Sequence, residues 1–369
     1  MAVRRLIGAA RLERLTGASL AMALCLAACG GGGAASDRQA SSPSPAPTAP
    51  STSPSAAPST QQLGWVRFLH VAGVVDLSLP RRDGPLVVAA AGRLSLLTRG
   101  GRLVPFARGS GGYRTILGPE PYVALSNGRA VPGAGCAFPP DVVYAIQPTI
   151  SPGVIAIDGK GHAGQFASLP HVRPNGIVFD DVGRFGFRLL VTAGLRGTTM
   201  VFAIDCKGNV ATIAPNAPSV EGGIAVAPRS FGRFGGDLVA PDERSGRLWA
   251  IDSTGRARLI ARSPLRRGPD IGVESIAFVP PAFDQGWSAY VADRRTPGNP
   301  HPGTDSILTF SGAGLVAAGV RVGDLIVAGE GGAQTIDIRC SAKCTVRHIA
   351  DGPRTSHIEG HIVFVPTLA

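Results

Sequence analysis

Residues 154–167 read VIAIDGKGHAGQFA, which is an apolar strand, a turn opened by Asp158 and closed by Gly161, and a second apolar strand. The same pattern returns as VFAIDCKGNVATIA at 201–214 and as LWAIDSTGRARLIA at 248–261. Aspartate caps such a turn with its own side chain, and glycine takes the positive φ that the turn requires. We therefore expect these aspartates to serve turns rather than chemistry.

Three looser copies complete the series: LSLLTRGGRLVPFA (94–107), ILTFSGAGLVAAGV (307–320) and IDIRCSAKCTVRHIA (336–350). A further strand precedes most hairpins and starts with a carboxylate or an amide. These starting residues are Glu120, Asn175, Glu221, Glu274 and Glu359.

A third apolar strand separates that strand from its hairpin, as at 189–194, 237–242 and 288–293. Each repeat then holds four short strands, and four-stranded units repeated at this spacing are typical of β-propellers. The sequence predicts an all-β protein with a six-bladed β-propeller of four-stranded blades. A sandwich or two smaller β domains are the alternatives. The last hairpin lacks a clear first strand. Either 361–366 joins the first hairpin to close the ring, or 65–71 supplies that strand.

The propeller is expected over residues 63–369. Residues 1–28 have the basic start and short apolar core of a secretory signal, and they end in Leu26-Ala27-Ala28 before Cys29. This ending resembles the lipobox of bacterial lipoproteins, which implies cleavage before Cys29 and its modification with lipid. An ordinary signal with a chance cysteine is the alternative.

Residues 29–62 follow as a Gly-, Ala-, Ser- and Pro-rich segment, which has too few apolar side chains to offset the entropy of ordering. We expect a disordered tether that starts at the lipidated cysteine. The protein is then expected in the cell envelope, anchored to the membrane by lipid, and at the outer membrane if the cell has two.

The net charge of +11 includes +3 from the signal, so +8 remains on the mature chain. The excess is arginine, scattered without aromatic interleaving or a nucleic-acid motif, and we expect no nucleic-acid partner.

Apart from Cys25 and Cys29, four cysteines remain. In an oxidising compartment an even number favours disulfides, Cys340 with Cys344 across a hairpin and Cys136 with Cys206. A zinc site is the alternative, although paired CxxC spacing is missing.

In a propeller the first strands line the channel, so their starting residues converge at one mouth. Carboxylates cannot gather there unless a cation joins them, arginines neutralise them or they point apart. Carboxylate and amide oxygens suit Ca²⁺ or another hard divalent cation. As an alternative, each glutamate accepts backbone N–H groups at its strand start. His357, Glu359 and His361 alternate, so on a regular strand they would face one side and offer further ligands.

Arg173-Pro174-Asn175-Gly176 and the pairs Glu221-Gly222 and Glu359-Gly360 resemble the senescence marker protein/gluconolactonase family of six-bladed propellers. That resemblance implies a divalent metal, often calcium, held by Asn175, Glu221 and Glu359, which polarises a lactone or ester carbonyl. The family's metal-binding aspartate and second asparagine have no match here.

Two functions follow as hypotheses. In the first, a tethered propeller binds a small or extended ligand at the channel mouth and hydrolyses a lactone or ester, with Glu274 or Glu120 as ligand or general base. In the second, a non-catalytic propeller resembling NHL repeats binds protein or glycan. Sugar oxidation with a quinone is a third possibility, which no constellation of residues supports.

Overall fold

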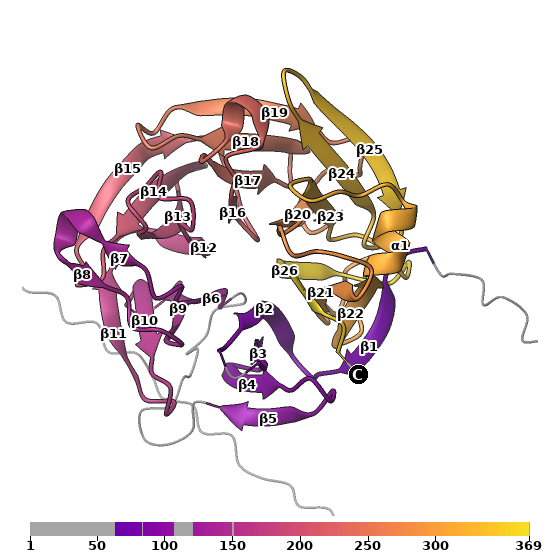
Figure 1. Ribbon diagram of the computed structural model, residues 1–369, viewed down its shortest axis with the longest axis horizontal. Coiled ribbons are helices and arrows are strands. Elements are labelled where there is room, and N and C mark those ends of the chain that lie inside the picture. Colours follow the sequence, from indigo (N-terminus) through magenta and orange to yellow (C-terminus); the bar gives the residue numbers. More distant parts are fainter. Residues whose placement is uncertain (1–62, 83, 107–120, 150, 369) are drawn as a thin grey trace, which may run out of the picture. The chain divides into compact units, whose positions relative to one another are not determined.

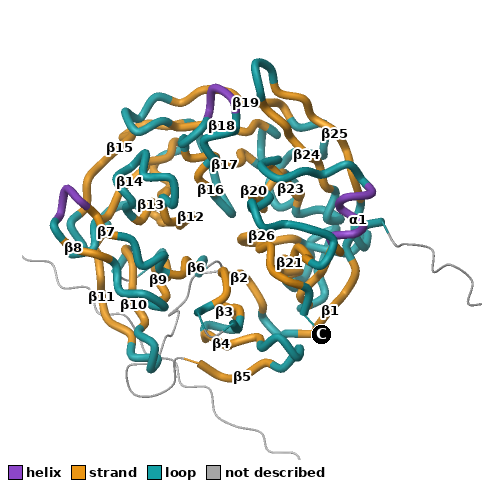
Figure 2. The backbone as a smooth tube through the Cα atoms, viewed as in Figure 1, coloured by secondary structure: helices purple, strands orange, loops and turns teal. Residues whose placement is uncertain are grey.

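A computed structural model describes residues 63–82, 84–106, 121–149 and 151–368. Six four-stranded antiparallel sheets stand around a central channel, as Figures 1 and 2 show. The predicted six-bladed propeller is therefore confirmed. Cys29, Glu120 and the predicted tether lie outside the described residues. No helix in the described ranges combines the length and hydrophobicity needed to cross a membrane.

Blades 1 to 4 each follow one continuous segment of the described chain, and their strands run in order from the channel outward. Blade 1 contains β2 (Val74–Pro80), β3 (Leu86–Ala90), β4 (Arg93–Leu97) and β5 (Leu103–Phe106). Blade 2 contains β6 (Val123–Leu125), β9 (Val143–Gln147), β10 (Gly153–Ile157) and β11 (Ala163–Ser168), with β7 (Ala130–Val131), the 3₁₀ turn Pro132–Ala134 and β8 (Cys136–Ala137) inserted. Blade 3 contains β12 (Arg173–Phe179), β13 (Leu189–Leu195), β14 (Thr198–Ile204) and β15 (Val210–Ala217). Blade 4 contains β16 (Ala225–Val226), the 3₁₀ turn Gly232–Phe234, β17 (Leu238–Asp242), β18 (Arg247–Ile251) and β19 (Ala257–Arg262).

Blades 5 and 6 exchange strands. Blade 5 contains β20 (Val273–Phe278), β23 (Leu325–Gly329), β24 (Thr335–Cys340) and β25 (Cys344–Ala350). Blade 6 contains β26 (Ile358–Pro366), β21 (Trp287–Asp293), β22 (Ser306–Ser311) and β1 (Val66–His70). The chain leaves β20 for two strands of blade 6 and then returns through α1 (Gly312–Ala317) to β23.

This exchange corrects three predictions. Residues 288–293 do not share a blade with Glu274, because β21 pairs with β22 and β26. The segment 307–320 is not a β-hairpin, since Ser311 accepts a hydrogen bond from Gly314 N and so caps a helix at the point where a turn was expected. Neither proposed closing strand joins the first hairpin, whose inner strand is β2. Instead both ends close blade 6, with β26 innermost and β1 outermost.

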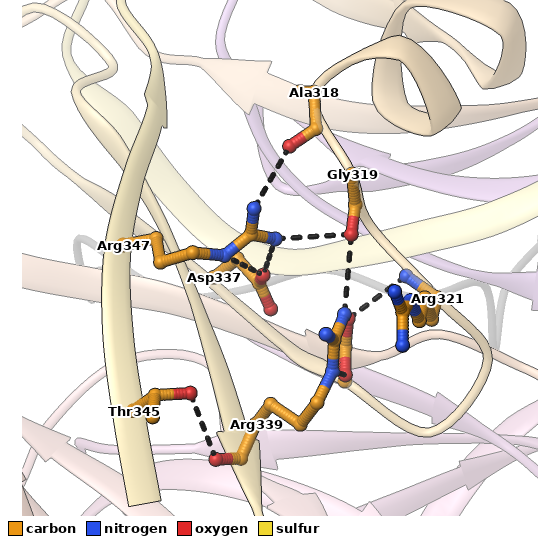
Figure 3. Close-up of polar contacts among 8 residues, drawn as sticks. Ala318, Gly319, Arg321, Asp337, Arg339, Thr345 and Arg347 are labelled. Carbon is orange, nitrogen blue, oxygen red and sulfur yellow. Dashed lines mark hydrogen bonds and ion pairs between the residues drawn. The ribbon is translucent and has the colours of Figure 1, made fainter.

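Salt bridges attach the returning segment to the outer half of blade 5 (Figure 3). Arg339 makes a bidentate contact with Asp324, at 2.7 Å from Nε and 2.5 Å from Nη2. Arg347 pairs with Asp337 and donates to the carbonyls of Ala318 and Gly319, just after α1. These contacts fix the crossover against β24 and β25.

The core consists of six apolar clusters in the described residues, one between each pair of neighbouring blades. Second strands such as β17 and β23 are buried at every position, because a blade covers each of their faces.

The hairpin turns are as predicted. Oδ1 of Asp158 accepts hydrogen bonds from Lys160 N and His162 N, and Gly161 has a φ of +86°. Both predicted disulfides, Cys136–Cys206 and Cys340–Cys344, are present.

Candidate metal centre at one mouth of the channel

First and second strands of a blade are antiparallel, so the starts of the first strands and the ends of the second strands meet at the same mouth. Glu274 belongs to β20 and Glu359 to β26, and both lie near the starts of these inner strands. Glu243 follows the end of β17, and Glu330 follows the end of β23. Four glutamates from three blades therefore converge at the channel.

These four glutamates and His357 are referred to below as the acidic cluster. All five residues are buried, with 8% exposure or less. Ligand atoms of Glu330, His357 and Glu359 lie within 4.8 Å of one another, as do those of Glu243, Glu274 and Glu330. Glu330 is common to both groups, so the five side chains form one continuous site.

Hydrogen bonds join the cluster across the channel. The hydroxyl of Tyr122, which precedes β6, lies 2.9 Å from Oε1 of Glu274 and 2.8 Å from Oε2 of Glu359. Arg294, which follows β21, donates to Glu359 at 3.0 Å. His357 Nε2 lies 3.4 Å from Glu359 and 3.5 Å from Glu330. Arg294 contacts Glu359, and Arg244, which is largely exposed, lies 3.8 Å from Glu243.

The carboxylates differ in their proton affinity. Burial and the charges of Glu274, Glu359 and Glu243 raise the pKa of Glu330 far above its usual range, which favours its protonated form. Burial also raises the pKa of Glu243, although the N–H of Asp270 opposes the shift. Burial alone would raise the pKa of Glu359, but its hydrogen bond with His357 and the charge of Arg294 lower it. Carboxyl groups this close together titrate as one coupled set.

The two Glu-Gly pairs have a steric basis. Gly222 has a φ of +83°, and a Cβ on it would lie 2.2 Å from Oε1 of Glu274. Gly360 has a φ of +66°, and a Cβ on it would lie 2.3 Å from Oδ1 of Asp76. In both places the glycine leaves room for a carboxylate that another blade supplies. The close approach of these carboxylates to the chain thus explains the glycines, but it does not explain the glutamates that precede them.

Glu221 and Asn175 lie at the rim. Both line a cavity of about 430 Å³ together with Arg173, Arg196 and Arg244. Asn175 Nδ2 donates to the carbonyl of Val220 at 2.8 Å, while its Oδ1 is buried without a hydrogen-bond partner among the described residues. Burial, followed by the charges of Glu243 and Glu359, raises the pKa of Glu221 to about 7. Glu221 therefore lies within electrostatic reach of the acidic cluster and also borders the cavity.

The predicted site residues thus fall into two groups. Glu274 and Glu359 meet through Tyr122, whereas Glu221 and Asn175 line the rim cavity. The prediction missed Glu243 and Glu330, although each follows an apolar second strand, in LVAPDE and LIVAGE. This recurrence is a sequence signal of the same kind as the strand starts.

His357 and His361 do not face one side, contrary to the alternation. The pairing of β26 with β21 shifts register between Tyr290 and Ala292, opposite residues 360–362. Such an irregularity re-aims side chains. His357 joins the cluster, and its backbone N–H is held by Asp293 at 2.8 Å. His361 turns instead to Asp76, with Nδ1 3.0 Å from both carboxylate oxygens.

No protein-family model matches the sequence, and no curated protein sequence is significantly similar to it. Solved structures with the propeller fold are distantly similar. Virginiamycin B lyase from Staphylococcus aureus is 12% identical over 82% of this chain and 96% of its own, with a TM-score of 0.45. A gluconolactonase from Xanthomonas campestris is 13% identical over 68% of this chain and 91% of its own, with a TM-score of 0.37. Regucalcin, a calcium-binding protein from Agrobacterium tumefaciens, is 14% identical over 64% of this chain and 74% of its own, with a TM-score of 0.37. These similarities concern the fold alone, so the function must be argued from the residues of the site.

Proposed function

We propose that the acidic cluster binds a divalent cation and that this cation serves ligand binding at the channel mouth. The observation that carries the proposal is the charge balance of the buried site. Four buried carboxylates, Glu243, Glu274, Glu330 and Glu359, stand against two arginines, Arg294 at Glu359 and the largely exposed Arg244 at Glu243, and burial among these charges raises the pKa of Glu330. Burying carboxylates without sufficient opposite charge is costly, and a divalent cation would remove that cost.

The donor atoms suggest two kinds of cation. Glu330, His357 and Glu359 offer one nitrogen and carboxylate oxygens, which suit Mn²⁺, Fe²⁺ or Zn²⁺. Glu243, Glu274 and Glu330 offer oxygens alone, which suit Ca²⁺ or Mg²⁺. His357 is therefore the residue that separates the two classes.

The cavity beside the cluster supports a hydrolytic role. A bound cation would act as a Lewis acid on a lactone or ester carbonyl. Glu221 lines the cavity and has a pKa of about 7, which suits a general base at neutral pH. Arg173, Arg196 and Arg244 on the cavity wall favour a substrate that carries a negative charge. In this proposal Glu221 is the general base and Glu274 is a cation ligand, because Glu274 lies inside the cluster against Tyr122. The sequence had suggested Glu221 as the ligand and Glu274 as a ligand or the base.

A non-catalytic propeller is the second candidate. The charge of Arg294 partly neutralises Glu359, and the hydroxyl of Tyr122 stabilises the same carboxylate by a hydrogen bond, without a metal. If these contacts suffice, the carboxylates hold the blades together, and the rim cavity with its arginines binds an acidic group of a glycan or protein.

Calorimetric titration of the purified protein with CaCl₂, MnCl₂ and ZnCl₂ separates these proposals. We expect stoichiometric binding of at least one cation, lost in Glu330→Gln and retained in Asp252→Asn. Asp252 is a matched control because it caps an outer hairpin turn, a task that asparagine also performs. His357→Gln should abolish binding of Mn²⁺ and Zn²⁺ if His357 is a ligand, and spare Ca²⁺ if only the oxygens bind. Absence of binding for all three cations contradicts the metal proposal and leaves the recognition propeller.

If a cation binds, the loaded protein is assayed on charged and uncharged lactones and esters. Glu221→Gln should abolish turnover while leaving cation affinity within a few fold. Turnover that persists in Glu221→Gln would exclude Glu221 as the base. Absence of turnover on every substrate would favour the non-catalytic role.

A further inference from the structure

The end of the propeller opposite the acidic cluster is formed by the hairpin connections of the blades. First strands start at the acidic mouth and neighbouring strands are antiparallel, so the first and third strands of a blade both finish at the opposite end. The connections between strands one and two, and between strands three and four, therefore lie there. The crossover 312–324 lies there too, because it leads from the third strand β22 to the second strand β23. This end is called the hairpin end below.

Exposed large apolar side chains are concentrated at the hairpin end. The described residues expose six such side chains, and five of the six belong to this end. Leu79 is the last residue but one of β2, while Leu103 and Val210 begin the fourth strands β5 and β15. Val316 and Val322 lie in the crossover and are 37% and 51% exposed. None of the six lies on a connection at the acidic mouth, as far as the chain is described.

The same end carries a large excess of exposed cations. In the described chain its connections expose twelve lysine and arginine side chains and two carboxylates, Asp181 and Asp284. The other aspartates there are buried or half-buried and accept hydrogen bonds from backbone groups or arginines, as Asp324 does from Arg339. The acidic mouth also exposes arginines, so charge alone does not distinguish the two ends. The hairpin end differs because it combines cations with exposed apolar side chains.

Cations and apolar side chains are close neighbours along the chain. Leu103 and Val322 each directly follow an exposed arginine, and Leu79 and Val210 each lie three residues from an exposed cation. A membrane surface suits this combination, because lipid phosphates attract the cation while the boundary of the acyl chains takes up the apolar side chain.

The crossover presents its two exposed valines on a fixed segment. Leu315 and Val320 of this segment are buried in the core between blades 5 and 6, whereas Val316 and Val322 face outward. The arginine contacts described above hold the segment against β24 and β25 (Figure 3). The core is therefore filled without Val316 and Val322, and packing does not explain why apolar residues occupy these exposed positions.

We propose that the hairpin end docks on a lipid bilayer that contains anionic lipids. The cations meet the phosphate groups, and the exposed apolar side chains enter the boundary between headgroups and acyl chains. An acidic polysaccharide would neutralise the cations equally well, but it offers no apolar phase for the leucines and valines. Docking in this orientation leaves the acidic cluster and the rim cavity facing away from the bilayer. The surface contains no residue of the acidic cluster, so this proposal does not rest on cation binding.

The test measures co-sedimentation of residues 63–369 with lipid vesicles. These residues contain every strand of the six blades, and their two ends close blade 6, so the ring is complete without the preceding segment. We expect binding to vesicles of phosphatidylcholine mixed with phosphatidylglycerol, and at least tenfold weaker binding to phosphatidylcholine alone. Added salt should weaken binding, because it screens exposed charges.

Arg99→Gln/Arg102→Gln removes two exposed cations from the β4–β5 turn of the hairpin end. Binding to the anionic vesicles should weaken at least fivefold, because each cation at an anionic surface adds to the attraction. Arg266→Gln/Arg267→Gln is the matched control, since these two exposed arginines lie between β19 and β20 at the acidic mouth. It removes the same charge and should change binding less than twofold.

Val316→Ser/Val322→Ser tests the apolar contribution without changing the charge, and it should weaken binding at least threefold. Leu63→Ser is the control and should leave binding unchanged. Leu63 is 59% exposed and precedes Gly64, which packs against the carbonyl of Asp351 beyond the mouth end of β25. A cooperative urea transition shows that each variant is folded.

The proposal is overturned if the anionic vesicles do not bind the protein, or if both arginine pairs weaken binding equally. It is also overturned if the valine pair has no effect, a result that would point to an acidic polysaccharide instead. Since no metal is added, these outcomes are independent of cation binding at the acidic cluster.

Discussion

The hydroxyl of Tyr122 in blade 2 lies 2.9 Å from Oε1 of Glu274 in blade 5, the opposite blade of the ring. The same hydroxyl lies 2.8 Å from Oε2 of Glu359. A phenol has one proton to donate, so it satisfies one carboxylate at a time, and the other contact needs a proton on the second carboxyl group. A cation at these oxygens would compete with that proton, which links cation binding to the structure of the channel.

Tyr122→Phe removes the donor while keeping the ring. We expect the free energy of unfolding to fall by about 1–3 kcal/mol, because buried carboxylate oxygens lose a hydrogen bond. Urea denaturation measures this loss, and a saturating cation that binds the cluster should reduce it. Tyr290→Phe is the control, since its hydroxyl accepts from Leu368 N away from the cluster. Its effect should be the same with and without the cation. A loss in Tyr122→Phe that is equally independent of the cation would argue against a metal at these oxygens.

Gly222→Ala tests the steric basis of the Glu-Gly pair. The new Cβ would meet the Glu274 carboxylate at 2.2 Å, so this side chain must move and the cluster must open. We expect cation affinity to fall more than tenfold. Gly197→Ala is the matched control, because Gly197 has a φ of +82° and no atom within 4 Å of the added Cβ. Both variants should lose about 1 kcal/mol or more of stability from backbone strain, but Gly197→Ala should keep its cation affinity. Equal affinities in the two variants would show that the position of Glu274 does not matter for binding.

The sequence predicts features that local chemistry decides. The turns at Asp158, Asp205 and Asp252 follow from side chains that bond to backbone groups two and four residues away. The exchange of strands between blades 5 and 6 was not predictable in this way. The segments 288–293 and 325–329 are both short and apolar, so either fits beside β20, and only the ring as a whole selects β23.

The site shows the same division. Glu274 and Glu359 could be predicted because strand starts converge in any propeller. From the sequence, Tyr122 could not be distinguished from an ordinary core aromatic residue. Its ring is fully buried, as in a core residue, but its hydroxyl lies in the cluster. The predicted direction of the His361 side chain was wrong because the strand pairing shifts register. Such a shift depends on the partner strand, β21, as well as on β26.

The pH dependence of stability reports on Glu221. Its pKa is raised from 4.5 to about 7 in the folded protein, so between these values the folded state holds a proton that the unfolded state releases. The free energy of unfolding should therefore fall as pH rises from about 4.5 to 7, by roughly 2 kcal/mol from this group after allowance for its partial exposure. Denaturation across this range in wild type and Glu221→Gln measures the contribution, which the variant should lack. Identical slopes in the two proteins would mean that Glu221 titrates normally.

We propose that Cys29, which lies outside the described residues, carries the lipid anchor. Cys29→Ser should abolish incorporation of labelled palmitate and leave a larger, uncleaved precursor, because cleavage of a lipoprotein signal follows modification of the cysteine. Cys25→Ser is the control and should incorporate label normally, since Cys25 lies within the segment that the proposed cleavage would remove. Equal labelling of both variants would exclude Cys29 as the modified residue.

The two disulfides should contribute unequally to stability. Cys136–Cys206 joins the insertion of blade 2 to the hairpin of blade 3 and spans 70 residues, whereas Cys340–Cys344 spans 4 within one hairpin. A cross-link restricts the unfolded chain more when the loop that it closes is longer, and loop-closure entropy predicts a difference of roughly 2–3 kcal/mol. We expect Cys136→Ala/Cys206→Ala to lower the free energy of unfolding by that much more than Cys340→Ala/Cys344→Ala, as measured by urea denaturation under oxidising conditions. Cys340 pairs directly with Cys344 in the β24–β25 ladder, so strand pairing already holds the ends of the short loop together. A larger loss in the hairpin variant would mean that the short disulfide acts on the folded blade rather than on the unfolded chain.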